Sequence, residues 1–250
     1  MAKQQPDSRC FDANGAPLAG AALLQRVREI GGDRLLFSFS MGKDSLAAWL
    51  WLRREAPDLE LIPYFLYWCP GLSFVEKSLA YYERLFDRHI IRLPHPLFYK
   101  MFRSGAFQPP ERMGKIMALD LPEFDYSDID RLLAHDYNLP ADFFCVVGMR
   151  AADNLQRLRL IQQMGALGFR KRHYYYPIWD WKIEQVAEII LAGDVALPAD
   201  YWYWGRTLAA FDYQYLKPLA EVYPQDYERL LFWFPLLETE FFRYEMSNAS

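Results

Sequence analysis

The chain has 250 residues, of which 52% are hydrophobic and 24% are charged, so it is long enough to bury the core of an α/β domain. Its 16 prolines and 13 glycines follow no period, which excludes a collagen-like or low-complexity protein. The net charge of −4 argues against a basic nucleic-acid-binding protein. Six basic residues against one acidic residue between Gly148 and His173 nevertheless suggest an anion site, although a solvated basic surface explains them equally well.

Neither a membrane-spanning segment nor a secretory leader is expected. The longest uncharged stretch, residues 61–75, contains two prolines and a glycine, whereas a spanning helix needs about 20 apolar residues without such breaks. The first residues are polar and no apolar run follows them. The cysteines at 10, 69 and 145 are unclustered, which favours a reducing compartment. We therefore expect a cytoplasmic protein with no membrane partner.

Apolar runs alternate with helical patterns along most of the chain. Strands alternating with helices predict an α/β fold with a doubly wound, mostly parallel sheet. No linker is evident, so we expect one domain over residues 1–250, with a core at 30–195 and an aromatic-rich helical extension at 196–250. Strands are expected at 35–40, 59–67, 89–93 and 143–149, and helices at 45–54, 74–86, 127–137, 153–165 and 182–191.

The sequence SFSMGKDS at residues 38–45 lies where the first expected strand meets the first expected helix. In a doubly wound sheet this junction is at the carboxyl edge of the strands, where ligands bind. Gly42 allows a tight turn, the first N–H groups of the helix can bind an anion, and Lys43 adds a positive charge for phosphate. The loop is not a Walker A motif, because Asp44 stands where that motif has Ser or Thr, and it is not a GxGxxG motif.

This loop resembles the PP-loop, SGGKDS in its commonest form, of the ATP pyrophosphatase superfamily, and the wider layout resembles its phosphoadenosine phosphosulfate reductase-like branch. Met41 stands where the family has its first glycine. The sequence GMRAADNLQR at 148–157 is similar to the family's G-[IM]-R-x-x-E-S-x-x-R segment, and PIWDWKIEQV at 177–186 is similar to P-[IL]-x-D-W-x-x-x-D-V. FLYW at 65–68 lies where the family has an Asp-Thr-Gly turn, but lacks that turn. The likeness covers roughly residues 30–195 and implies an adenine nucleotide alpha hydrolase-like fold.

The resemblance implies that the loop holds the phosphates of ATP, that Lys43 neutralises their charge and that Asp44 positions magnesium or the phosphates. Strand ends near Phe65, Tyr67 and Gly148 would hold the adenine and ribose. The candidate catalytic residues are Lys43, Asp44 and Arg150. The candidate nucleotide-binding residues are Ser38, Ser40, Met41, Gly42, Lys43, Asp44, Ser45, Phe65, Tyr67, Gly148 and Arg157, and Asp44 is the candidate magnesium ligand.

With ATP bound, the resemblance implies that a substrate oxygen attacks the α-phosphorus, pyrophosphate leaves and an adenylated product forms, in nucleotide or nucleic-acid modification among other settings. A thiol-dependent sulfonucleotide reductase is rejected, because that reaction uses a cysteine near the C-terminus and no cysteine follows Cys145. Two alternatives stay open: a non-catalytic nucleotide-binding or interaction protein, and a sulfonucleotide-binding enzyme without the thiol step.

The last part of the chain carries a dense set of aromatic residues, including YWYW at 201–204 and FWF at 232–234. Packing between helices is the simpler interpretation of this pattern. The alternative is a surface that binds a protein partner, a second copy of the chain or nucleobases. The sequence does not choose between them.

Overall fold

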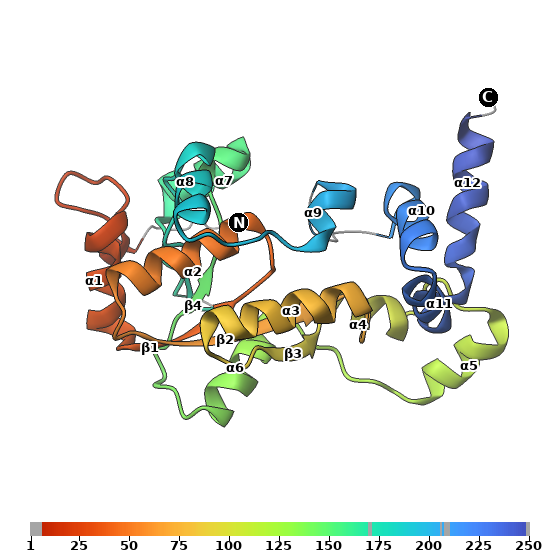
Figure 1. The fold of residues 1–250 in the computed structure, drawn as a ribbon. Coiled ribbons are helices and arrows are strands. Elements are labelled where there is room, and N and C mark those ends of the chain that lie inside the picture. Colours follow the sequence, from red (N-terminus) through yellow and green to blue (C-terminus); the bar gives the residue numbers. More distant parts are fainter. Residues whose placement is uncertain (1–6, 170–171, 206, 208–210, 249–250) are drawn as a thin grey trace. The chain divides into compact units, whose positions relative to one another are not determined.

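The computed structural model describes residues 7–169, 172–205, 207 and 211–248 (Figure 1). The chain divides into two compact units, each made of two separate stretches. Unit 1 comprises Met1–Phe65 and Tyr126–Leu197, and unit 2 comprises Leu66–Asp125 and Pro198–Ser250. The expectation of one domain with a core at 30–195 stays a prediction, but residues 66–125 from within that range group with the C-terminal residues.

The five strands are in the order β3-β2-β1-β4-β5, and β1 pairs in parallel with both β2 and β4. β4 also pairs in parallel with β5. Together with the flanking helices, this sheet confirms the predicted α/β fold. The strands are β1 (Arg34–Ser38), β2 (Glu60–Tyr67), β3 (Ile91–Pro94), β4 (Cys145–Val147) and β5 (Tyr174–Tyr175).

In unit 1 the core forms around β1, whose three central residues, 35–37, are fully buried. A continuous apolar run suits a strand that is covered on both faces. The ring of Phe37 meets the edge of Trp49 on α2 at a centroid distance of 5.1 Å, and α2 packs against α8. The helices of unit 1 are α1 (Gly20–Gly31), α2 (Lys43–Glu55), α6 (Tyr126–Asp136), α7 (Leu155–Met164) and α8 (Ile183–Ala192), with 3-10 turns at Ser8–Cys10 and Ala151–Asp153.

A buried polar cluster ties α6 to the sheet in unit 1. Tyr64 donates a hydrogen bond to Asp130 at 2.9 Å, and Arg172 pairs with the same carboxylate. Arg172 also lies 3.3 Å from the sulfur of Cys145. Arg172, one of the six basic residues between Gly148 and His173, therefore faces inward and pairs within the protein, instead of forming part of an anion site or a solvated basic surface. Residues 170 and 171 lie outside the described residues.

In unit 2 the C-terminal stretch completes a structure that starts at residue 66. The carboxylate of Asp226 on α11 is buried and accepts hydrogen bonds from the backbone N–H of Ser73 at 2.8 and 2.9 Å and from its hydroxyl at 2.7 Å. It therefore satisfies the N-terminus of α3. The helices of unit 2 are α3 (Ser73–Phe86), α4 (Pro96–Arg103), α5 (Pro110–Ala118), α9 (Ala199–Trp204), α10 (Tyr213–Val222), α11 (Pro224–Trp233) and α12 (Thr239–Asn248), with a 3-10 turn at Pro235–Glu238.

Many aromatic residues of the C-terminal stretch pack inside unit 2. Phe98 on α4 meets the rings of Trp233 and Phe234 edge-on, at 5.7 and 5.6 Å. Trp204 stacks on Tyr215 at 4.4 Å. This agrees with helix packing as the simpler interpretation, although Trp202 and Phe242 remain 85% and 65% exposed.

The expected elements agree with the structure where the apolar pattern was long. The helix expected at 153–165 is interrupted at Asn154, whose extended backbone (φ −162°) ends a 3-10 turn and caps α7. The sequence analysis did not identify α1, α4 or α5. None of the helices in the described part of the chain is both long and apolar enough to cross a membrane.

Candidate functional site

The loop between β1 and α2 turns at Met41. This residue has a φ of 58°, in the left-handed region that favours glycine. A non-glycine residue pays about 1–2 kcal/mol for that conformation. The Met41 side chain is only 2% exposed, so its burial offsets this strain. The departure from the PP-loop pattern thus occurs at a position where the backbone has the conformation that glycine adopts most readily.

Hydrogen bonds between two serines and the turn fix the rest of the loop. The Ser40 hydroxyl accepts from the backbone N–H of Gly42 at 3.3 Å and donates to the Ser45 hydroxyl at 3.1 Å. Ser45 donates in turn to the carbonyl of Gly42 at 2.8 Å. Among the described residues, no hydrogen-bond partner is present for the backbone N–H groups of Asp44 and Ser45 in the first turn of α2. Such N–H groups at a helix start form an anion-binding site.

The neighbouring strand brings a second segment against this loop. The parallel register pairs Ser38, the last residue of β1, with Val147, the last residue of β4. Gly148 follows directly, and a Cβ there would lie 2.4 Å from the Cα and 2.5 Å from the nitrogen of Ser45. Only glycine allows the two backbones to approach so closely.

A series of ion pairs links the loop to the start of α7. The sequence analysis proposed both its inner cation, Arg150, and its outer cation, Arg157, but missed Asp153, which joins them. The i+3 and i+4 spacings around Asp153 were the available signal. This ion-pair ladder consists of Lys43–Asp44 (3.0 Å), Asp44–Arg150 (2.7 Å), Arg150–Asp153 (2.5 Å) and Asp153–Arg157 (2.5 Å).

The ladder alternates three cations with two carboxylates, so it carries one net positive charge beside the helix N-terminus. Its central residue, Arg150, is only 5% exposed. Both oxygens of Asp44 accept from cations, Oδ1 from Arg150 and Oδ2 from Lys43. This arrangement orients the guanidinium of Arg150 and neutralises Asp44, which would otherwise repel a phosphate.

Among the described residues, the side chains near the loop do not form a ready-made cluster of magnesium ligands. Within the described ranges, no group of three or more His, Cys, Asp or Glu side chains is arranged to hold a metal ion. Magnesium binds one or two carboxylates together with phosphate oxygens, but the carboxylate of Asp44 is occupied by Lys43 and Arg150. The assignment of Asp44 as a metal ligand stays a prediction.

Residues 177–186, which are similar to a third segment of the PP-loop family, contact the backbone next to Arg150. The carbonyl of Trp179 accepts from the N–H of Ala151, next to Arg150, at 2.7 Å. The indole of Trp179 donates to the carbonyl of Leu18 at 2.9 Å. Residues 177–181 therefore anchor the backbone that carries Arg150.

The two nucleotide-binding candidates in β2, Phe65 and Tyr67, have side chains that pack within the protein. Phe65 is 7% exposed and belongs to the core of unit 1. Tyr67 belongs to unit 2, where its ring meets Phe98 at 6.0 Å and its carbonyl accepts from the N–H of His95 at 3.0 Å. Their roles in holding adenine and ribose stay predictions.

The cysteines are buried thiols. Cys145 in β4 is fully buried, and burial raises the pKa of its thiol to about 12. Burial likewise raises the pKa of Cys69 to about 12. Both are therefore protonated at neutral pH and are poor nucleophiles.

No protein-family model matches the chain, and no curated protein does. Among solved structures, it is similar to an FMN adenylyltransferase of Candida glabrata in complex with FMN and the ATP analogue AMPCPP, at 12% identity and a TM-score of 0.43. The similarity covers 70% of this chain and 53% of that one, so the chain spans about half the length of this neighbour. The protein is thus classified by its own strands and helices, as an α/β fold with a mostly parallel five-stranded sheet.

Proposed function

We propose that the loop at residues 40–45 binds the phosphates of ATP, and that the protein transfers the adenylyl group to an acceptor with release of pyrophosphate. The observation that carries the proposal is the pair of N–H groups at Asp44 and Ser45, which have no hydrogen-bond partner among the described residues and lie beside Lys43 and Arg150. A helix start with two adjacent cations provides the hydrogen bonds and the charge that bind a polyphosphate.

In the proposed reaction, an oxygen of the acceptor attacks the α-phosphorus of ATP. The bond between this phosphorus and the oxygen that bridges to the β-phosphorus breaks, and pyrophosphate leaves with the electron pair. Lys43 and Arg150 stabilise the negative charge that develops on the phosphates. Catalysis of this kind depends on positioning and charge stabilisation rather than on a protein nucleophile, which suits a site whose nearby thiol, Cys145, is buried and protonated.

Magnesium enters this proposal as part of the magnesium–ATP substrate. The acceptor is proposed to be a nucleotide or a nucleic acid, as the resemblance to the PP-loop superfamily implies. Ser38, Ser40, Met41, Gly42, Gly148 and Arg157 would complete the nucleotide site around the loop.

Calorimetric titration with magnesium and an ATP analogue that carries a methylene group between the α- and β-phosphorus tests the binding step. This analogue cannot release pyrophosphate, so the titration measures binding alone. Lys43→Ala should weaken binding by about 10- to 100-fold, the range for a lost charged hydrogen bond. Lys115→Ala, which removes an exposed lysine on α5, is the matched control and should leave the affinity unchanged.

A pyrophosphate-release assay with ATP and candidate acceptors tests the transfer step. Release that depends on both an acceptor and Lys43 supports the proposed reaction. Binding of ATP without release under any acceptor supports the non-catalytic alternative. A preference for a 3′-phosphorylated sulfonucleotide over ATP supports the alternative of a sulfonucleotide-binding enzyme.

A further inference from the structure

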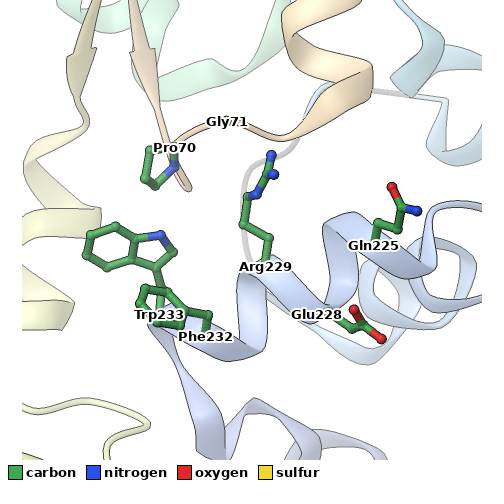
Figure 2. A pocket seen from close by; sticks show the side chains of 7 residues that line it. All are labelled: Pro70, Gly71, Gln225, Glu228, Arg229, Phe232 and Trp233. Atoms are coloured by element: carbon green, nitrogen blue, oxygen red, sulfur yellow. The ribbon is translucent and has the colours of Figure 1, made fainter.

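Unit 2 contains a groove that the proposed ATP site does not use. It lies between the turn that follows β2 and the helix α11, and its volume is about 550 Å³ (Figure 2). The groove is shallow and open to solvent, and its volume is large enough to hold a small molecule. The lining residues are Pro70, Gly71, Gln225, Glu228, Arg229, Phe232 and Trp233.

The groove has fixed walls on both sides. Asp226 on α11 holds the backbone N–H of Ser73 at 2.8 Å, which fixes the distance between the helix and the turn. Gly71 in the turn has a φ of 73°, and a Cβ there would lie 3.2 Å from Nη1 of Arg229. The guanidinium of Arg229 therefore lies against the backbone of the turn, at a position where any side chain would crowd it.

Arg229 provides an exposed positive charge at the groove. It makes no ion pair or hydrogen bond with any residue in the described part of the chain. Figure 2 shows its side chain reaching from α11 toward Gly71, while the side chain of Glu228 is directed away from Trp233. A guanidinium in this position can hold a carboxylate or phosphate through two parallel hydrogen bonds.

Trp233 provides a second donor from a rigid position. Its ring meets Phe98 and Phe102 edge-on, each at 5.7 Å, and its carbonyl accepts from Gln108 at 2.5 Å. Its indole N–H forms no hydrogen bond within the described residues, and Figure 2 shows the indole nitrogen on the side of the ring toward Arg229. Since an indole N–H donates only, an anionic group is the ligand chemistry that suits both residues.

Phe232 adds an apolar surface to the rim of the groove. Its ring is 66% exposed, lies 5.8 Å from the guanidinium carbon of Arg112 and meets the ring of Trp233 edge-on at 5.8 Å. Arg112 also donates to the backbone carbonyl of Phe232 at 2.7 Å. An exposed aromatic ring is suited to stacking on a planar ligand.

We propose that this groove binds a small molecule made of a planar aromatic ring with one acidic group. The acidic group is held by Arg229 and the indole N–H of Trp233, and the ring lies against Phe232 and Pro70. Glu228 contributes one negative charge to the lining, which disfavours polyphosphates relative to a ligand with a single carboxylate or phosphate ester. The groove shares no residue with the loop at residues 40–45.

Calorimetric titration of the full chain with four probes tests the proposal. 1-Naphthoate and 1-naphthyl phosphate carry both ring and acid, whereas 1-naphthol carries only the ring and inorganic phosphate only the acid. We expect 1-naphthoate and 1-naphthyl phosphate each to bind at least tenfold more tightly than 1-naphthol and inorganic phosphate. The ratio of the dissociation constants of 1-naphthoate and 1-naphthyl phosphate distinguishes a carboxylate site from a phosphate site. If the combined probes bind no better than 1-naphthol or phosphate alone, the proposal is wrong.

Substitutions in the groove test whether its residues bind the probes. Arg229→Gln should weaken binding of the tighter probe by about tenfold or more, as expected for a lost charged hydrogen bond, and Arg229→Lys should restore part of it. Phe232→Ala should weaken binding by a few-fold while the exposed position leaves the fold intact. Arg243→Gln changes an exposed arginine on α12 and serves as the control.

Equal affinity in Arg229→Gln and Arg243→Gln would overturn the assignment. Lys43→Ala should bind the aromatic probe as the unchanged protein does, whatever its effect on ATP. Failure of the groove proposal and failure of the ATP-binding proposal can therefore be distinguished.

Discussion

The guanidinium of Arg150 donates a hydrogen bond to the carboxylate of Asp44 at 2.7 Å, although the two residues are 106 positions apart in the sequence. The contact exists because β1 and β4 are parallel neighbours whose last residues pair, so the segments that follow them meet at one edge of the sheet. Asp44 therefore acts as the link between the loop and the cation that the proposed reaction needs.

Arg150→Gln removes the central cation of the ion-pair ladder. We expect the free energy of unfolding to fall by about 3 kcal/mol, because the carboxylates of Asp44 and Asp153 lose a largely buried partner. We also expect ATP affinity to fall by about tenfold or more. Urea denaturation and calorimetric titration measure the two effects. Arg159→Gln, an exposed position on α7, is the control, and equal effects of the two changes would contradict a special role for Arg150.

Met41→Gly replaces the buried residue at the left-handed turn with the residue that the PP-loop pattern has there. Relief of strain is worth about 1–2 kcal/mol, but loss of the buried Met41 side chain costs about 2–5 kcal/mol and glycine adds about 0.5–1 kcal/mol of entropy. We expect a net loss of about 2 kcal/mol in denaturant unfolding. Met41→Leu keeps both the strain and the bulk and should change stability by less than about 1.5 kcal/mol. A glycine variant as stable as the original would show that strain outweighs burial.

Gly148→Ala tests the close approach of β4 to α2. The new Cβ would overlap backbone atoms of Ser45, which cannot move aside as a flexible side chain can. We expect stability to fall by about 1–3 kcal/mol or more and ATP binding to weaken, because the first turn of α2 must shift. Gly114→Ala on α5, where a Cβ meets nothing within 4 Å, is the matched control and should be neutral or slightly stabilising. A mild effect at Gly148 would rule out the close contact.

Stability should fall as pH decreases below about 6.5. Burial lowers the pKa of His95 from 6.5 to about 4, so the unfolded chain takes up a proton at a higher pH than the folded protein does. Neutral His95 also accepts from the N–H of Leu97 at 3.1 Å, which caps α4. We expect the free energy of unfolding to drop by about 1 kcal/mol between pH 7 and pH 5, after allowance for solvent screening. His95→Gln keeps an acceptor but does not titrate, so it should lose less stability over this interval; parallel losses would refute the assignment.

The strands and helices with long apolar patterns could be predicted from the sequence. The expected strand at 59–67 and helix at 74–86 agree with β2 (Glu60–Tyr67) and α3 (Ser73–Phe86) to within one residue at each end. In contrast, α4 (Pro96–Arg103) is too short for its period to stand out and begins with a proline. The break at Asn154 depends on its side chain accepting from the N–H of Arg157, which the helical pattern does not reveal.

The loop of the candidate site was evident from its residue types, but its surroundings were not. The contact between Gly148 and Ser45 depends on strand register, which is a long-range property of the sheet. Asp153 was evident as the one acidic residue in a basic stretch, but only the structure places it between Arg150 and Arg157. The inward turn of Arg172 could not be foreseen either, because its partner Asp130 is 42 positions away on α6.

The hydrogen bond from Tyr64 to Asp130 joins the chain on either side of residues 66–125. The two stretches of unit 1 thus meet near the point where the chain leaves for unit 2 and returns. Residues 66–125 are not a removable insertion, because they contain β3 (Ile91–Pro94), a strand of the five-stranded sheet. The N-terminus of α3, in the same stretch, has its hydrogen-bond acceptor in Asp226, far along the chain. The C-terminal residues are accordingly the second half of unit 2, and a chain ended at residue 197 would leave residues 66–125 without the partner that satisfies α3.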